Sequence, residues 1–290
     1  MKTNYLNNKD ILKEIHKSKS TYCTFVDVVA TDYDVILDSV DKINKTSILE
    51  ARKARAERLA KLAHETAVLS TGEKKKLEEF EIDPTDIPTT DVVFRVMTWE
   101  HVPVDEAKTK KFNDALKESM IDDDELHNEY DDDLPKNTKY IRVNFPPFCH
   151  YRVDDKETPV LVGKSHWKGD LITGTFSKDH GSITKKLAHM FMKLCERYAT
   201  RSNWRGYTYN DEMRSQALLQ LSQIGLQFDE TKSQNPFAYY TAAITNSFTR
   251  VLNIEKRNQN IRDDIMEMNG LNPSYTRQNM SGGSFGGYDD

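Results

Sequence analysis

The sequence predicts a mainly α-helical protein that carries a small β-rich insert and ends in a disordered tail. Apolar residues recur at helical spacing from residue 183 to about residue 258, and residues 47–69 are rich in Ala, Arg, Glu, Lys and Leu, which favour helices. Between residues 90 and 177, short apolar runs are bounded by prolines, as strands often are. The tail from residue 271 is rich in Gly, Ser and Asn and has little to bury.

These patterns divide the chain of 290 residues into four parts. We expect an N-terminal helical segment at 1–69 that packs on a helical bundle, a charged linker with the β-rich insert at 70–178, the bundle itself at 179–270, and a flexible tail at 271–290. A chain of this length can bury a core of its own. Within these parts, helices are predicted at 5–18, 32–43, 47–69, 183–201, 211–228, 235–258 and 263–269, and strands at 92–99, 139–145, 158–167 and around Phe176.

The chain is slightly acidic, with 41 Lys and Arg against 46 Asp and Glu and a formal net charge of −5. This balance excludes a nucleic-acid-binding protein that is basic over its whole surface. Residues 183–262, however, carry twelve Lys or Arg and only six Asp or Glu. Any contact with DNA therefore has to come from a local basic patch.

Three cysteines are far apart in the sequence, and no Cys-x-x-Cys pair occurs. This pattern indicates neither a disulfide framework nor a thiolate zinc site, and it suits a reducing cytoplasm. No apolar run approaches the length of a membrane span, and the polar N-terminus has no signal-peptide core. We therefore expect a soluble protein of the cytoplasm with no membrane partner.

One predicted helix, from Asn235 to about residue 258, organises the C-terminal part of the chain. Asn235 suits the N-cap and Pro236 the first helical position. Its apolar face contains Phe237, Tyr240 or Thr241, Ile244, Phe248, and Val251 or Leu252. Its other face carries Tyr239, Ala243, Asn246, Arg250, Asn253 and Arg257. Rings that stack on bases, amides that read base edges and arginines that hold phosphates suit a nucleic-acid surface. A core helix with a mixed polar face is an equally supported alternative.

The preceding helix, predicted at 211–228, has apolar residues beyond those needed for a core. Its core stripe is Met213, Ala217, Leu221, Ile224 and Phe228. Three further leucines, Leu218, Leu219 and Leu226, lie outside the stripe among Gln216, Gln220, Gln223 and Gln227. Apolar groups with uncharged polar neighbours favour contact with a protein partner.

The order of these residues resembles region 2 of bacterial sigma factors, and most closely that of the late-transcription sigma factors of T-even-type bacteriophages. A helix ends in Gly225-Leu226-Gln227-Phe228-Asp229, and a polar turn leads to Asn235-Pro236-Phe237-Ala238-Tyr239-Tyr240 and a basic tail. The first residues, Asn4-Tyr5-Leu6-Asn7-Asn8-Lys9-Asp10-Ile11-Leu12, are similar to the opening of those factors. The resemblance covers roughly residues 183–262 and 1–20, as expected for an extended form in marine relatives of these phages.

The resemblance implies a bundle of the sigma region 2 type and a promoter-specificity factor without a cofactor or metal. Such a factor binds the host core RNA polymerase at the clamp helices of its largest subunit. It then recognises and opens an A/T-rich late promoter element for viral late transcription, by capturing non-template-strand bases, in the cytoplasm of the infected bacterial host. A sliding clamp and a late co-activator are further partners that the resemblance suggests.

The implied binding residues form three sets. The DNA-binding set is Tyr239, Tyr240, Ala243, Asn246, Arg250, Asn253, Lys256, Arg257 and Arg262. The polymerase-binding set is Glu212, Ser215, Gln216, Leu218, Leu219 and Ser222. The sliding-clamp set is Phe285 and Tyr288. Tyr239 corresponds to a strand-separating tyrosine of the housekeeping sigmas, which carry two tryptophans where this chain has Ala242 and Ala243. The wedge between the strands is therefore either weaker here or supplied by Phe237, Tyr240 or Trp204.

Several segments support two interpretations. The aromatic loop at 204–209 is either a hydrophobic plug or a base-stacking element. The insert, with Phe145, Phe148, Tyr151 and Trp167 expected on its surface, either docks on a partner or only stabilises the fold. The acidic run at 105–135 lacks the spacing of a calcium loop and is expected to be a mobile loop.

No catalytic motif supports an enzyme. The sequence has no Gly-rich phosphate loop, no His-Glu-x-x-His and no Gly-x-Ser-x-Gly. The alternative to a sigma factor is a non-catalytic helical scaffold or DNA-packaging accessory protein that binds duplex DNA.

Overall fold

A computed structural model describes residues 7–71, 76–112 and 139–282. Helices account for most of this part of the chain, which also contains a mixed β-sheet. The chain forms two compact units, a sheet unit of residues 13–184 and 226–234 and a helical unit of residues 1–12, 185–225 and 235–290. These units differ from the four parts predicted from the sequence, because strands from the N-terminal segment and from the insert belong to one sheet.

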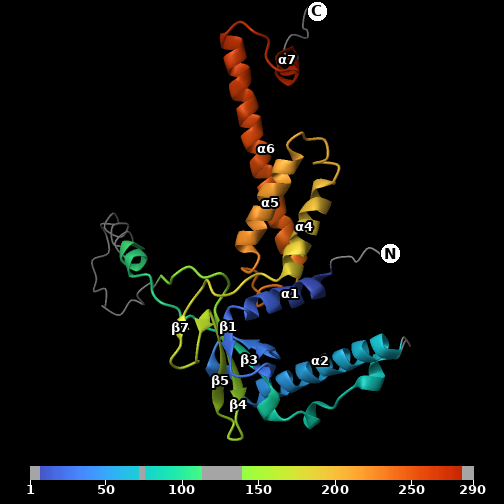
Figure 1. The fold of residues 1–290 in the computed structure, drawn as a ribbon, viewed down its shortest axis with the longest axis vertical. Coiled ribbons are helices and arrows are strands. Elements are labelled where there is room, and N and C mark those ends of the chain that lie inside the picture. Colours follow the sequence, from blue (N-terminus) through green and yellow to red (C-terminus); the bar gives the residue numbers. More distant parts are fainter. Residues whose placement is uncertain (1–6, 72–75, 113–138, 283–290) are drawn as a thin grey trace, which may run out of the picture. The chain divides into compact units, whose positions relative to one another are not determined.

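The sheet unit is built on five strands in the order β1-β5-β4-β3-β2 (Figure 1). The pairs β1–β5, β5–β4 and β4–β3 are antiparallel, and β2 pairs in parallel with β3. A second, two-stranded sheet joins β6 to β7. The strands are β1 (Cys23–Phe25), β2 (Val35–Leu37), β3 (Phe94–Met97), β4 (Phe148–Val153), β5 (Pro159–Ser165), β6 (Trp167–Lys168) and β7 (Thr175–Phe176).

The strands predicted at 92–99, 158–167 and Phe176 are confirmed as β3, β5 and β7. Other predictions for this region are wrong. Residues 32–43 contain strand β2 and a short 3-10 helix instead of an α-helix, and 139–145 holds only an isolated bridge at Tyr140. The strand of this region is β4, which begins at Phe148 and was not predicted from the sequence. Phe145 and Phe148, expected on the surface, are buried, so they are not available for docking.

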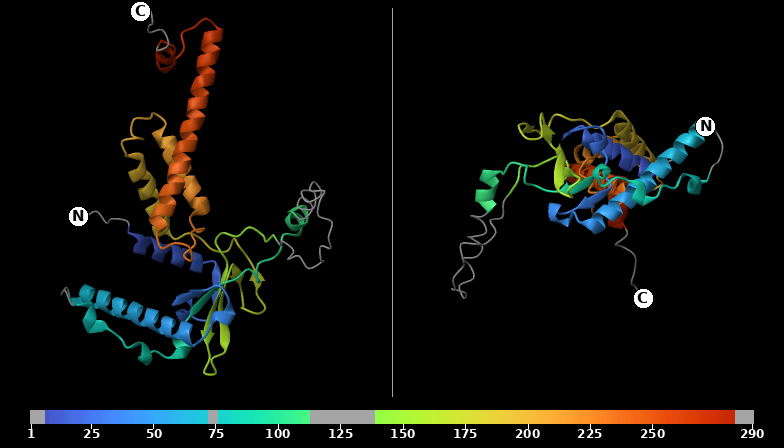
Figure 2. Two further views of the ribbon diagram at one scale, coloured as in Figure 1. Left: turned by 180° about the vertical axis from the view of Figure 1, so that it is seen from behind. Right: turned by 90° about the horizontal axis from the view of Figure 1, so that it is seen from below.

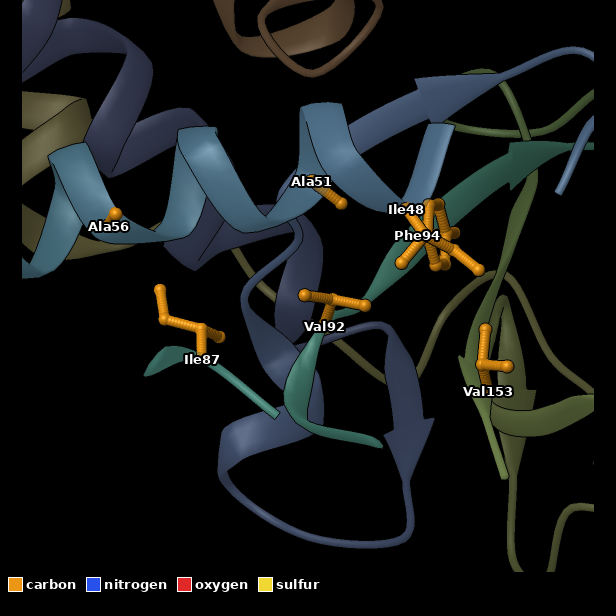
Figure 3. Packing of buried hydrophobic residues seen from close by; sticks show 7 residues of the cluster. All are labelled: Ile48, Ala51, Ala56, Ile87, Val92, Phe94 and Val153. Carbon is orange, nitrogen blue, oxygen red and sulfur yellow. The ribbon is translucent and has the colours of Figure 1, made fainter. Parts of the chain in front are cut away.

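Helix α2 (Lys45–Thr71) covers a compact apolar cluster of the sheet unit (Figure 3). Small and branched side chains on one side of α2 meet residues of β3 and β4 and of the segment that leads into β3. The cluster consists of Ile48, Ala51, Ala56, Ile87, Val92, Phe94 and Val153. The two alanines allow close approach of the helix backbone, while Arg55 and Arg58 of α2 pair with the buried carboxylate of Asp34.

Arg95 on β3 is a fully buried cation of the sheet unit. Its guanidinium lies 3.8 Å from the ring centroid of Tyr33 and 3.9 Å from that of Phe148. Its Nε donates to Nε2 of His150 at 3.0 Å, and His150 Nδ1 contacts the carbonyl of Ala30 at 2.7 Å. The stacked rings and the neutral imidazole compensate the loss of water around the charge.

The helical unit contains α4 (Lys185–Ala199), α5 (Asn210–Ile224), α6 (Pro236–Met268) and α7 (Tyr275–Gly282), and helix α1 (Asn8–Ser20) begins in it. Helix α5 packs against both α4 and α6. The helices predicted at 183–201 and 211–228 are confirmed, although α5 ends four residues earlier and the following Leu226 is buried instead of exposed. Residues 106–112 are also helical, and the 3-10 helices are Val29–Thr31, Val40–Lys42, Leu77–Phe80, Pro84–Asp86 and Thr89–Asp91.

Helix α6 is a single helix of 33 residues, where the sequence predicted an end near 258 and a separate helix at 263–269. At 1.5 Å per residue it is about 50 Å long. It continues past the ends of α4 and α5, and the chain then turns back into α7 (Figure 2). Helix α7 lies in the segment predicted to be disordered, so that prediction is wrong for residues 275–282. Within the described residues no helix is both long and apolar enough to cross a membrane.

The buried imidazoles of the sheet unit should make its stability depend on pH. Burial lowers the pKa of His16, lowers that of His150 well below its usual value, and lowers that of His166 to about 3. These groups favour the neutral form when folded, so their stabilising effect is complete above about pH 6.5 and is lost as the pH falls toward the folded pKa values. Urea unfolding of the sheet unit, followed near pH 7.5 and near pH 5, should show a lower midpoint in acid. His150→Gln should weaken this dependence, and an unchanged midpoint in the wild type would contradict it.

Candidate nucleic-acid interface

Helix α6 begins at a well-defined cap. The Asn235 side chain accepts a hydrogen bond from the amide of Ala238 at 3.1 Å, and Pro236 occupies the first turn, as predicted. A second side chain, Asn8 of α1, accepts from the amide of Phe237 at 3.1 Å. Two of the free amides at the start of the helix are thereby satisfied, which fixes the position of the first turn.

Tyr240 is fully buried and anchors α6 in the helical unit. Its hydroxyl donates to the carbonyl oxygen of Gly225, just after α5, and its ring meets the edge of Phe191 on α4 with centroids 4.9 Å apart. The buried stripe continues along α6 through Ile244, Phe248 and Val251. The assignment of Tyr240 to the DNA-binding set is therefore wrong, because neither its ring nor its hydroxyl reaches the surface.

A groove of about 910 Å³ separates the outer faces of α5 and α6. From α5 it is lined by Glu212, Gln216, Leu219, Gln220, Gln223 and Ile224, and from α6 by Tyr239, Ala242, Ala243, Asn246, Ser247, Arg250, Val251, Ile254 and Glu255. Amides, small side chains and one half-buried ring dominate this lining. Because Ala242 and Ala243 are small, they leave the α6 wall of the groove open.

Most of the predicted DNA-binding set gathers on this side of α6. Tyr239, Ala243, Asn246 and Arg250 line the groove, and a shallower hollow continues from it between Asn246, Thr249, Arg250, Asn253, Ile254 and Arg257. Tyr239 is half-buried, and burial raises the pKa of its hydroxyl. Lys256 and Arg262 are exposed on the same helix but line neither hollow. The structure thus brings six of the nine predicted residues to one continuous surface.

The predicted polymerase-binding set is divided by the structure. Glu212, Gln216 and Leu219 line the groove together with the DNA-binding set. Ser215, Leu218 and Ser222 lie outside it, and the two serine hydroxyls donate to backbone carbonyls of their own helix. Half of the α5 set therefore faces the α6 set across one groove.

The charge around the groove is not uniform. Glu212 and Glu255 lie in its wall, while Arg250, Lys256 and Arg257 form no ion pair with any residue that the structure describes. Nearer the end of α6, carboxylates are engaged by α7. Asp263 accepts from the amide and the hydroxyl of Ser274, and Arg277 pairs with Asp264 at 2.6 Å and Glu267 at 2.9 Å. The cations nearest the groove therefore remain available to an anion.

Of the three rings in the aromatic loop at 204–209, Trp204 belongs to the core, while Tyr207 and Tyr209 are half-exposed. Trp204 is buried, and its ring meets Phe248 of α6 with centroids 5.4 Å apart in an edge-to-face arrangement. The hydrophobic-plug interpretation is correct for this ring. Of the aromatic rings considered as alternative wedges, Tyr240 and Trp204 are buried, and only Phe237 is exposed, at 39%.

Sequence reasoning missed part of the groove. Gln220, Gln223, Ser247 and Ile254 line it but were not assigned to any site. The signal was present, since Gln216, Gln220 and Gln223 recur at helical spacing and share a face. Phe285 and Tyr288, the sliding-clamp set, lie outside the described residues.

Comparison with known proteins gives no relative, because no family model, curated protein or solved structure matches the chain. The resemblance to sigma factors therefore stays a prediction from the sequence.

Gly225 should be needed for the contact that anchors α6. A Cβ atom there would lie 2.6 Å from the Phe191 ring and 2.7 Å from the Leu221 carbonyl oxygen, so Gly225→Ala should lower the free energy of unfolding by about 1–3 kcal/mol. Gly206→Ala is the matched control, because a Cβ at Gly206 has no neighbour within 4 Å. Urea unfolding measured by circular dichroism compares the two. Equal midpoints for both variants would show that α6 is anchored in another way.

Proposed function

We propose that this protein is a promoter-specificity (sigma) factor that binds a core RNA polymerase and opens an A/T-rich late promoter element of a bacteriophage. The observation that carries the proposal is the groove between α5 and α6. It combines in one hollow a half-buried Tyr239, amides on both walls and Arg250, which forms no ion pair with the residues that the structure describes. The resemblance of residues 183–262 to sigma region 2 supports the same function.

The groove suits an unstacked base better than a duplex. Glu212 and Glu255 in its wall would repel the phosphates of a helix that lay along it, while Gln220, Gln223 and Asn246 can pair with the edge of a single base. Extruding a base costs a few kcal/mol, and stacking on an aromatic ring returns about 1–3 kcal/mol. Tyr239 is the only aromatic ring in the groove lining and is the natural stacking partner.

The cations beyond the groove would hold the backbone of the opened strand. Arg250, Asn253 and Arg257 line the hollow that continues along α6, and Lys256 and Arg262 are exposed nearby. The non-template strand could then run along α6 with one base in the groove and its phosphates on these side chains. We also propose that the helical unit has the fold of sigma region 2.

The polymerase contact is assigned to the part of α5 that does not face the groove. Ser215, Leu218 and Ser222 are spaced at helical intervals and lie outside the groove lining. A partner helix on this stripe would leave Gln216 and Leu219 for the DNA side. The proposed partner is the pair of clamp helices of the largest polymerase subunit. A sliding clamp and a co-activator complete the proposed assembly.

A second candidate function is a non-catalytic scaffold or packaging accessory protein that binds duplex DNA. The exposed cations Lys256, Arg257 and Arg262 favour this function, because they can bind the phosphates of duplex DNA without an unpaired base. The two candidates differ in partner and in DNA. A sigma factor co-purifies with core polymerase and selects A/T-rich promoters, whereas a scaffold binds random duplex equally well without polymerase.

Removing the groove's ring and cation should separate promoter opening from polymerase binding. Tyr239→Ala with Arg250→Ala should leave the complex with core polymerase intact and reduce opening at least about 5-fold, since stacking alone is worth ~1–3 kcal/mol per base. Permanganate reactivity of unpaired thymines measures opening. Met266→Ala is the control, because this exposed side chain lies on the same helix outside the groove. Unchanged opening in the double variant, or an equal loss with Met266→Ala, would place the DNA site elsewhere.

Substitutions in the two halves of the α5 set, Ser215, Leu218 and Ser222 outside the groove and Glu212, Gln216 and Leu219 inside it, should have different effects. Ser222→Arg puts a long charged side chain on the stripe proposed to contact polymerase and should abolish co-purification with core enzyme. Gln216→Ala, in the groove, should keep polymerase binding and weaken only promoter opening. Size-exclusion chromatography of the mixed proteins measures the first property and permanganate footprinting the second. If Gln216→Ala instead breaks the polymerase complex, the groove itself is the polymerase site.

A further inference from the structure

The free half of α6 carries an apolar stripe that nothing in the described chain covers. Ile254, Ile261, Ile265 and Met268 are exposed at 49%, 47%, 53% and 86%. With Asn258 they are spaced by alternating steps of four and three residues, which is the a/d pattern of a coiled coil. On a helix of 3.6 residues per turn these five side chains lie within about 80° of one another.

The stripe continues the helical unit's own core. Tyr240, Ile244 and Val251 occupy the same register within the bundle, where α4 and α5 cover them. Beyond Val251 the stripe becomes exposed. Figure 1 shows that α6 continues past α4 and α5. An apolar helix face that extends beyond the helices covering it is typical of a helix that binds another helix.

The chain's own last helix does not fill this role. Ser274, just before α7, and Arg277 of α7 bond Gln259, Asp263, Asp264 and Glu267. These residues lie on the side of α6 opposite the stripe or at its border. Helix α7 therefore contacts the polar face of α6 and leaves the apolar stripe exposed.

We propose that two copies of this chain pair through residues 254–268 of α6 as an antiparallel two-stranded coiled coil. In the register that sets Ile254 beside the partner's Ile265 and Asn258 beside the partner's Ile261, the flanking charges match. Glu255 faces the partner's Arg262, and Arg257 faces the partner's Asp264, each pair occurring twice. Asp264 also binds Arg277 but is still 58% exposed.

Charge and bulk both disfavour the parallel alternative. Parallel pairing would set Arg257 against the partner's Arg262, a like-charge contact on both flanks. It would also bring both three-helix bundles to the same end of the stripe. Antiparallel pairing places them at opposite ends. Asn258 opposite an isoleucine weakens the antiparallel pair, so the dimer should be reversible.

Sedimentation velocity of the full-length chain over about a hundredfold range of concentration tests this inference. The wild type should show a reversible equilibrium between monomer and dimer. Ile261→Asp should abolish the dimer, and Met266→Asp should not, because Met266 is an exposed apolar residue of the same helix outside the stripe. Helical content from circular dichroism confirms that both variants fold. A wild type that stays monomeric throughout, or equal effects of the two variants, would overturn the proposal.

Charge reversal tests the orientation. Arg262→Glu replaces attraction by repulsion at two contacts of the antiparallel dimer and should raise its Kd about 10-fold or more. Adding Glu255→Arg should restore the wild-type Kd. In a parallel dimer, Arg262→Glu would face the partner's Arg257 and tighten binding, which would overturn the antiparallel arrangement. The inference is independent of the proposed transcription function, because it needs neither DNA nor polymerase.

Discussion

The contact between the buried Tyr240 hydroxyl and the Gly225 carbonyl determines where every other residue of α6 lies. It joins the first turns of α6 to the end of α5, and the absence of a side chain at Gly225 allows the Phe191 ring to close the gap. Once Tyr240 points inward, helical geometry rotates its neighbour Tyr239 by about 100° toward the groove. The same rotation sends Asn246 and Arg250 to the groove and Ile244 and Phe248 to the core. A single anchored ring thus sets both the stability and the chemistry of the helix.

The sequence predicted the elements whose signals are long or local. Helix α2 has strong helix formers throughout, and the Asn235-Pro236 cap is a local signal that needs no tertiary contact. It failed on β1 and β2, because three-residue strands are too short to show a period and are formed by pairing with β5 and β3. It also placed the end of α6 near 258, because the polar residues there were read as a break. They are instead the exposed side of one continuous helix.

For the site, the periodicity of the sequence predicted which residues of α6 share a face, but not that α5 lies beside this face. It placed Tyr239, Asn246 and Arg250 together, and the structure confirms that they line one groove. It could not distinguish Tyr240 from Thr241 as the core residue, since adjacent positions both border the apolar stripe. It also could not show that α5 turns Gln216 and Leu219 toward α6, because the packing of two helices depends on shape rather than on either pattern alone. The groove is therefore a tertiary feature built from two helices whose presence, but not whose ends, the sequence predicted.

The two proposals make use of the same length of helix and therefore affect each other. Arg257 and Arg262 belong to the set proposed to hold DNA phosphates, and the same two side chains flank the apolar stripe beyond Val251. In an antiparallel dimer each would pair with a carboxylate of the partner chain and would no longer be free for phosphate. Tyr239 lies about four turns before the stripe, in the groove that α5 helps to form, but Ile254 and Glu255 line the far end of that groove and also belong to the pairing residues. A dimer would thus lose phosphate contacts and would border the base site, so association of the chain with itself and its binding to DNA oppose each other, mainly through two arginines.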